Sequence, residues 1–311
     1  MTSQFKQRAS AEAIFGSAAR GDSDRLSDRD YLIVDNDLAV LRRRAEELSA
    51  EGWSVASYTF RKLDVLAKKG ALFLQHLKQE SVIVEDNGGR LRSLINNFQP
   101  KSSYETEIKD NSELSMLINH RPSGAVGALW AADVLYVTVR NFGVLKLAEL
   151  GVYKFSFREV IEHLAEIGIL DSEDPSDFLS LRFCKTLYRS DMLGGSHRVD
   201  ALMARSLDAL PPSLFPSESV EVEALDILLS LAALKTLPNP YTRIRAIEKG
   251  MIAADDFDPA FFSPELRRAV DKWIRDPRCY AFAAGRFDLA EFGKIGASKD
   301  KVTSLYRTAK A

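Results

Sequence analysis

Residues 11–34 have the sequence AEAIFGSAARGDSDRLSDRDYLIV. The apolar run Ala11–Phe15 predicts a short β-strand that leads directly into Gly16 and Ser17. A second strand is expected over Asp28–Val34, where an apolar run follows two acidic residues. Two strands joined by a polar segment begin an alternation of strands and helices, which is typical of α/β and α+β domains.

The alternation continues through the following residues. We expect a helix over Leu38–Glu51, where apolar residues recur at helical spacing, and a strand over Trp53–Phe60, which is rich in β-formers. A helix interrupted at Gly70 is expected over Arg61–Lys78, and a further strand over Val82–Glu85. The predicted fold of the first domain is therefore α/β, a small mixed sheet with helices on one side.

Strand signals nearly vanish after Pro100, and helical periodicity replaces them. The predicted helices of this part are Ser112–Ile118, Gly124–Leu150, Phe157–Ile167, Ser176–Tyr188, Arg198–Leu207, Val220–Thr236, Tyr241–Lys249 and Pro264–Ile274. We therefore expect two domains, an α/β domain over residues 1–98 and an all-α domain over residues 99–311.

The composition excludes several classes of protein. The 311 residues include 42 basic and 44 acidic side chains, and this balance gives no sign of a protein that coats long nucleic acid. Cys184 and Cys279 have no spacing typical of a zinc site or a disulfide scaffold. The longest apolar stretches each contain an acid and are shorter than the ~20 residues of a membrane helix. We expect no membrane partner and a cytoplasmic location.

One spacing in the first domain points to chemistry. Gly16-Ser17 is followed, after ten residues, by Asp28-Arg29-Asp30. Gly16 has no Cβ, so backbone amides there can approach phosphate oxygens, and Ser17 adds a hydroxyl donor. Asp28 and Asp30 are two apart on the expected strand, so their side chains project to one face and can bind Mg²⁺, or Mn²⁺ in its place. The pattern predicts a metal site beside a triphosphate site.

This segment resembles the DNA polymerase β-like nucleotidyltransferase superfamily, in which an apolar residue, Gly-Ser, a spacer and Asp-x-Asp precede an apolar strand. The pairs Arg20-Gly21 and Ser27-Asp28 look like those of minimal nucleotidyltransferases. A helical module after the catalytic domain is similar to the arrangement in kanamycin nucleotidyltransferase. The resemblance covers mainly residues 11–95.

The resemblance implies Mg²⁺-dependent transfer of an NMP from an NTP to an acceptor hydroxyl or phosphate, with release of pyrophosphate. Gly16 and Ser17 would hold phosphates with help from Arg20, and Asp28 and Asp30 would hold the metal and carry the catalysis. The helical domain would select the acceptor. A small molecule, a protein side chain, a second nucleotide and a tRNA end all remain open as acceptors.

The resemblance also implies a third carboxylate on the next strand, and here the sequence departs from the family pattern. The expected position is Ser54 or Ala56, and neither is acidic. Acids that could substitute are Glu51, Glu85, Asp86 and Asp133. If none does, transfer is slow or absent, and the alternative is a regulatory or antitoxin-like protein that binds nucleotide.

A simpler interpretation treats the loop acids as hydrated surface groups. These acids are Asp22, Asp24, Asp28 and Asp30. Asp30 adjoins a strand that we expect to be buried, where an acid with no partner is costly. That position favours the functional interpretation.

A basic stripe is predicted on the helix Ser176–Tyr188 and the residue after it. Arg182, Lys185 and Arg189 recur at i, i+3 and i+7, so they share one face of the helix. They bind nucleotide in one interpretation and form a solvated face in the other, and both remain open. The side chains expected on the opposite, buried face are Leu179, Phe183, Cys184 and Leu187.

Three other groups have structural interpretations that we favour over binding. Arg243 and Arg245 are expected at the surface, and residues 42–44 (three arginines) on the exposed side of an amphipathic helix. His76 lies on an otherwise apolar helix and is expected to be packed rather than to bind a ligand.

Overall fold

The computed structural model describes residues 9–171, 175–190, 198–231, 237, 239–257 and 262–275. The chain divides into two compact units. Unit 1 comprises Met1–Tyr104 and Val144–Val160, and unit 2 comprises Glu105–Gly143 and Ile161–Ala311. The segment Val144–Val160 thus returns to the first unit after the chain has entered the second.

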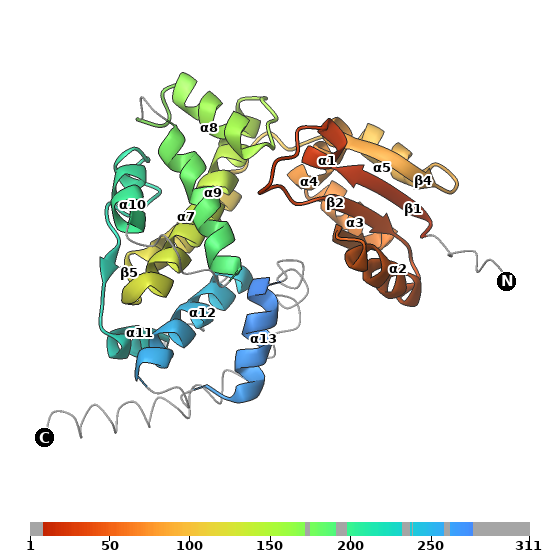
Figure 1. Ribbon diagram of the computed structural model, residues 1–311. Coiled ribbons are helices and arrows are strands. Elements are labelled where there is room, and N and C mark those ends of the chain that lie inside the picture. Colours follow the sequence, from red (N-terminus) through yellow and green to blue (C-terminus); the bar gives the residue numbers. More distant parts are fainter. Residues whose placement is uncertain are drawn as a thin grey trace, which may run out of the picture. The chain divides into compact units, whose positions relative to one another are not determined.

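A four-stranded sheet forms the centre of unit 1 (Figure 1). Its strands are β1 (Ala11–Phe15), β2 (Asp30–Val34), β3 (Ser54–Tyr58) and β4 (Ser81–Asp86), in the order β3-β2-β1-β4. β1 is antiparallel to both β2 and β4, whereas β2 and β3 are parallel. The predicted α/β class with a small mixed sheet is confirmed.

Helices cover both faces of this sheet. They are α2 (Leu38–Ala50), α3 (Phe60–Lys68), α4 (Leu72–Glu80) and α5 (Arg90–Asn97), and a single turn, α1 (Ser17–Arg20), follows β1. Tyr31 and Ile33 of β2 pack with residues of α2, whereas Leu32 and Val34 pack with residues of the other three long helices. The expectation of helices on one side is wrong, because successive β2 residues are apolar and bury both faces.

Most boundaries in unit 1 follow the expected ones. Gly70 separates α3 from α4, as its position in the helical pattern predicts. The expected strand over Asp28–Val34 begins only at Asp30, so Asp28 lies in the preceding loop. Helix α5 was not expected, and the Asp86 carboxylate caps it by accepting the backbone N–H groups of Leu91 (3.1 Å) and Arg92 (2.9 Å).

The remaining elements are mainly helices. They are α6 (Glu105–Ser115), the 3₁₀ turn η1 (Met116–Ile118), β5 (His120–Arg121), α7 (Gly124–Glu149), α8 (Phe157–Glu166), α9 (Ser176–Arg189), α10 (Val199–Asp208), β6 (Val220–Glu221), α11 (Ala224–Ser230), α12 (Pro240–Phe257) and α13 (Pro264–Arg275). Strands β5 and β6 form a two-residue parallel pair. Cys279 and residues 232–236 of the expected helix Val220–Thr236 lie outside the described residues.

Among the described residues, one helix is long and apolar enough to cross a membrane, judged by length and composition alone, and it is α7. Of its apolar window, 72% is buried inside the protein. Its Asp133 side chain is fully buried and ion-paired. These features are those of a core helix.

A buried ion pair joins the sheet of unit 1 to α2. Glu12 of β1 has no exposed surface, and its carboxylate accepts hydrogen bonds from Arg44 Nε (2.9 Å), Arg44 Nη2 (3.0 Å) and the Tyr31 hydroxyl (2.8 Å). Burial alone would raise the pKa of Glu12, but these donors hold the pKa below its ordinary value. The expected exposure of residues 42–44 is therefore wrong for Arg44, which is buried.

We expect Arg44→Met to lower the free energy of unfolding by about 3 kcal/mol, because it leaves the Glu12 charge buried without its partner. The matched control is Arg43→Met on the same helix, whose guanidinium lies 4.0 Å from Glu47 at an exposed position. That change is expected to cost about 0.5 kcal/mol or less. Urea denaturation of both variants measures the difference, and equal losses would contradict the assignment.

Candidate functional site

Pairing of β1 with β2 brings Gly16 next to Asp30. Phe15 pairs with Asp30 across the antiparallel ladder, and Gly16 follows at once. Gly16 has φ 66° and ψ −147°, a backbone conformation that residues other than glycine adopt only with strain. A Cβ at this position would lie 3.1 Å from Asp30 Oδ2. Backbone conformation and the neighbouring carboxylate therefore both favour glycine here.

The loop after α1 folds back onto the same turn. The Ser17 hydroxyl donates to the backbone oxygen of Asp28 (3.4 Å), and the Ser23 hydroxyl lies 3.3 Å from that of Ser17. Asp28 itself is exposed. The structure thus gathers Gly16, Ser17, Asp28 and Asp30 at one end of β1 and β2. Of the two acids, only Asp30 lies on the strand.

The two remaining loop acids have structural partners. Asp24 closes a tight turn by accepting the Leu26 backbone N–H (2.9 Å) and the Ser27 hydroxyl (2.8 Å). Asp22 accepts from Arg20 Nε at 3.1 Å.

A second set of side chains adjoins Gly16, and the sequence patterns did not indicate it. Glu80, at the end of α4, accepts the Gly16 backbone N–H with its own backbone oxygen (3.1 Å). Its carboxylate forms an ion pair with Arg20 and lies 3.0 Å from His76 Nε2. That same nitrogen lies 3.8 Å from the Cβ position of Gly16, so Asp30 and His76 flank one point.

The ring of His76 is held in place by aromatic contacts. It stacks on Phe155 with ring centroids 4.5 Å apart and meets Phe15 edge-on at 5.5 Å. The expectation of a packed histidine is confirmed. Its contact with the Glu80 carboxylate was not predicted from the sequence. The signal that could have found this pair is the i, i+4 spacing of His76 and Glu80 at the end of a helix.

Glu80 remains an anion in this setting. Burial alone would raise the pKa of its carboxyl group, but the hydrogen bond from His76 and the charges of His76 and Arg20 outweigh burial. The pKa is therefore held below its ordinary value, and the group is ionised at neutral pH.

A serine lies beside Asp30 on β3, at the position where the resemblance implies a third carboxylate. Asp30 pairs with Ser54 in the parallel ladder between β2 and β3, which confirms the expected register. Residues paired in this way project to the same face of a sheet. The neighbour of Asp30 on β3 is therefore a hydroxyl, and among the described residues no cluster of three or more acids, histidines or cysteines could hold a metal.

Three of the four proposed substitutes lie elsewhere. Glu85 and Asp86 pair with Glu12 and Ala11, at the opposite end of β1 from Gly16. Asp133 is fully buried in unit 2, where Arg189 and Arg245 bind it. They are therefore unsuited to the third position, because each is fixed far along a strand or inside a helical core. Glu51 follows α2 and is exposed.

The three residues of the predicted basic stripe on α9 have different surroundings. Arg189 Nε donates to Asp133 Oδ1 (3.1 Å), so its charge is used inside unit 2. The Lys185 ammonium lies 5.3 Å from the centre of the Tyr136 ring, and Arg182 is partly exposed. The buried residues of α9 are Phe178, Leu181, Cys184 and Leu187. Phe183, expected to be buried, is 52% exposed.

The interior of unit 2 contains a larger polar network around Arg245. This side chain is 1% exposed, which contradicts its expected surface position, and its Nη1 donates to Asp133 Oδ2 (2.7 Å). Its Nε lies 2.7 Å from Glu248 Oε2, and Glu248 also accepts from the Tyr188 hydroxyl (2.8 Å). Burial raises the pKa of Glu248, whereas Asp133 keeps a lowered pKa because the charges of Arg189 and Arg245 outweigh its burial.

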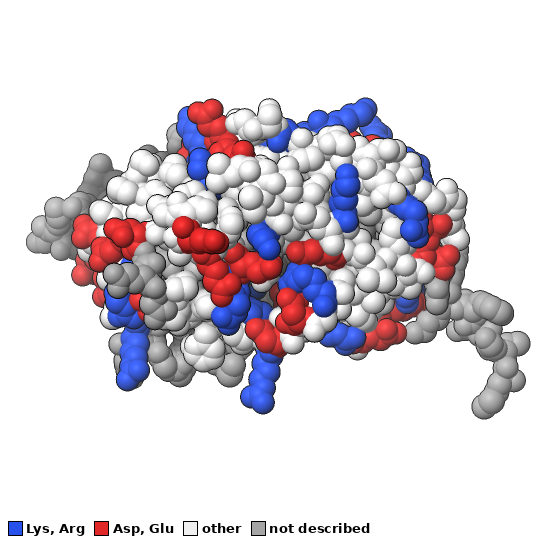
Figure 2. Space-filling view, turned by 90° about the horizontal axis from the view of Figure 1, so that it is seen from above, with Lys and Arg blue, Asp and Glu red and all other residues white. Residues whose placement is uncertain are grey.

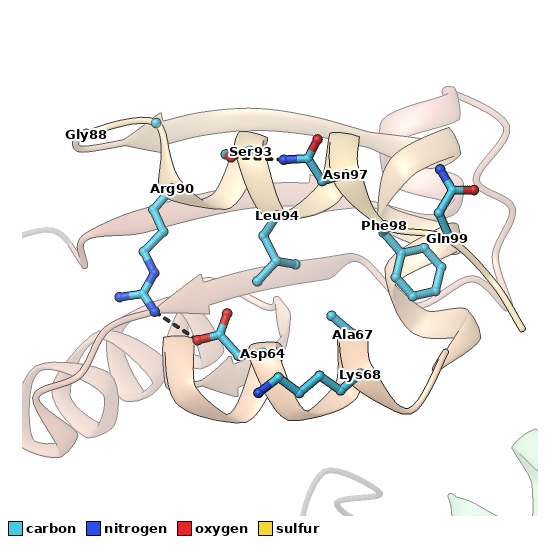
Figure 3. A pocket seen from close by; sticks show the side chains of 11 residues that line it. Asp64, Ala67, Lys68, Gly88, Arg90, Ser93, Leu94, Asn97, Phe98 and Gln99 are labelled. Carbon is cyan, nitrogen blue, oxygen red and sulfur yellow. Dashed lines mark hydrogen bonds and ion pairs between the residues drawn. The ribbon is translucent and has the colours of Figure 1, made fainter.

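A groove in unit 1 lies apart from the Gly16 turn. Helices α3 and α5 form its walls, with Leu94 and Ala67 pointing inward and an Arg90–Asp64 ion pair (2.9 Å) across one end (Figure 3). None of its lining residues belongs to the predicted motif. Asp64, its acid, is already paired with Arg90, so the groove offers no acid pair for a metal.

We expect Gly16→Ala to lower the free energy of unfolding by about 2–3 kcal/mol, since the new Cβ meets both backbone strain and the Asp30 carboxylate. Gly21→Ala is the matched control, because Gly21 has φ 78° and open space around its Cβ position. It is expected to cost about 1 kcal/mol. Comparison of urea midpoints measures the excess, and an equal loss in both variants would show that Asp30 does not crowd the turn.

Comparison of the chain with protein-family models, with curated proteins and with solved structures gave no match.

Proposed function

We propose that this protein is a nucleotidyltransferase of the DNA polymerase β-like kind, located in the cytoplasm, which moves an NMP from an NTP to an acceptor hydroxyl or phosphate. The observation that carries the proposal is the Gly16 turn, where a Cβ would lie 3.1 Å from the Asp30 carboxylate. Such a turn lets a phosphate chain approach the backbone next to an acid that can hold a cation.

The turn offers donors for a phosphate chain. The first amides of a helical turn have no acceptor within the helix, and in α1 these belong to Ser17 and Ala18. The Ser17 hydroxyl lies at the same place and is held by the Asp28 backbone. Arg20, at the other end of α1, adds a positive charge. These groups are suited to the β- and γ-phosphates of an NTP.

The carboxylates of Asp28 and Asp30 supply the oxygen ligands that Mg²⁺ prefers in proteins. Mg²⁺ bound there would offset the charge of the triphosphate and of the pyrophosphate that leaves. The chain's own residues would do the rest. Gly16 and Ser17 would orient the phosphates, and Asp30 would be fixed by its place at the start of a buried strand.

The helical unit would select the acceptor. On the face of the molecule in Figure 2, basic and acidic side chains are interspersed. With a net charge of −2, this favours a small acceptor or a single chain end over long nucleic acid. An aminoglycoside-type small molecule, a protein side chain, a nucleotide and a tRNA end remain the acceptor classes to test.

Asp28→Asn combined with Asp30→Asn is expected to lower NMP transfer by about 1000-fold, because the metal loses its ligands. Labelled NTPs with Mg²⁺ or Mn²⁺ and a panel of acceptors would be followed for product. The matched control is Asp35→Asn with Asp37→Asn, two acids with the same spacing at the other end of β2. Transfer by the first double variant at the parental rate would refute the site.

A second candidate function is nucleotide binding without turnover, as in a sensor or an antitoxin-like regulator. The observation that favours it is the pairing of Asp30 with Ser54, where the resemblance implies an acid. This protein would show saturable NTP binding with no product.

Ser54→Asp distinguishes the two functions. If the missing carboxylate limits turnover, an acid beside Asp30 should raise the transfer rate by about 10- to 100-fold, the scale of general-base catalysis. The control is Ser57→Asp on the same strand, which pairs with Ile33 and projects to the opposite face. Product formation by the parent, together with no gain from Ser54→Asp, would mean that the serine is not the limiting defect.

A further inference from the structure

Two donors from different elements converge on the Glu80 carboxylate beside the Gly16 turn. Arg20 reaches it from α1 through Nη1, and His76 lies one helical turn before it on α4, with Nε2 at 3.0 Å. The Glu80 side chain is only 11% exposed. A carboxylate held by a guanidinium and a ring N–H has the same partners that proteins use to bind a phosphate oxygen.

The position of this carboxylate links it to the proposed nucleotide site. The Glu80 backbone oxygen accepts the Gly16 N–H (3.1 Å), which fixes the end of α4 against the turn. His76 Nε2 and Asp30 Oδ2 lie 3.8 Å and 3.1 Å from the same Cβ position of Gly16. The donors that hold Glu80 therefore adjoin both the predicted phosphate turn and a predicted metal ligand.

We propose that Arg20 and His76 form a phosphate-binding subsite, which the Glu80 carboxylate occupies in the free protein and leaves when a triphosphate binds. The inference rests on the proposed function, because it names His76 as a further ligand of that same phosphate chain. Glu80 then acts as an internal competitor.

Other charges near the subsite are compatible with this exchange. Asp22 also binds Arg20, through Nε at 3.1 Å, and is exposed. Arg20 can therefore keep one anchor while Nη1 exchanges a carboxylate for a phosphate oxygen. The ring of His76 stays fixed by Phe155 and Phe15, so its Nε2 keeps its direction during the exchange.

Loss of the Glu80 charge should strengthen triphosphate binding rather than weaken it. Glu80→Gln keeps the size of the side chain but removes a negative charge, so binding of a triphosphate should become tighter by about fivefold, the scale of repulsion between charges in a partly hydrated site. Arg20→Met and His76→Phe should each weaken binding by about fivefold or more. The phenyl ring keeps the stacking on Phe155 and lacks the N–H.

The test is a calorimetric titration of the full chain with tripolyphosphate and Mg²⁺, a probe that carries the phosphate chain without a base. Two matched controls remove equivalent pairs away from the turn. Glu166→Gln loses the exposed His163–Glu166 pair (3.0 Å), and Asp64→Asn frees Arg90 (2.9 Å). Both should bind the probe as the parent does.

The titrations distinguish failure of the Arg20–His76 subsite from failure of the proposed metal-triphosphate site. If the Asp28/Asp30 double variant loses the probe while Glu80→Gln binds it no more tightly than the parent, the subsite is wrong and the metal-triphosphate site stands. Undetectable binding of the probe and of all four NTPs to the parent would overturn both. Tighter binding in Glu80→Gln with weaker binding in Arg20→Met and His76→Phe supports the competitor.

Discussion

The antiparallel pairing of Phe15 with Asp30 is the constraint on which the candidate site depends. β1 ends and β2 begins at this pair. Gly16, the first residue after β1, therefore lies beside Asp30, the first residue of β2. Glycine suits both features of that place, a positive φ and a Cβ position that would lie 3.1 Å from the carboxylate. The proposed phosphate turn and the proposed metal ligand would thus both follow from a single backbone register.

The surrounding structure keeps that register fixed. Apolar residues of β2 face alternately toward α2 and toward α3–α5, so a shift by one residue would turn every buried side chain to the wrong face. The buried Glu12–Arg44 pair adds a polar contact with strict geometry, since Glu12 can meet Arg44 and Tyr31 in one register only. The packing of β2 therefore helps to position Asp30 at the start of its strand.

Three arginines of the protein are committed to buried carboxylates. Arg189 and Arg245 neutralise the buried Asp133, and Arg44 neutralises Glu12. A guanidinium held by a buried carboxylate is costly to redirect toward a ligand, because the acid would be left uncompensated. Arg20 differs, since both of its partners lie at the turn itself and Asp22 is exposed. This difference favours Arg20 over Arg189 as the basic residue proposed for the triphosphate.

The sequence by itself determined the four strands of unit 1 and most of its helices, the Gly16–Asp30 motif and the register that places Ser54 beside Asp30, because these depend on local periodicity and on spacing of two along a strand. The tertiary structure alone decided which charges are buried and which side chains from distant segments meet. Arg44, Arg245 and Asp133 look like surface or site residues in any local pattern, and only packing across elements reveals their partners. Glu80 and His76 reach Gly16 because β4 pairs with β1 and brings the end of α4 to the turn. These residues are too far apart in the sequence for local periodicity to predict the contact.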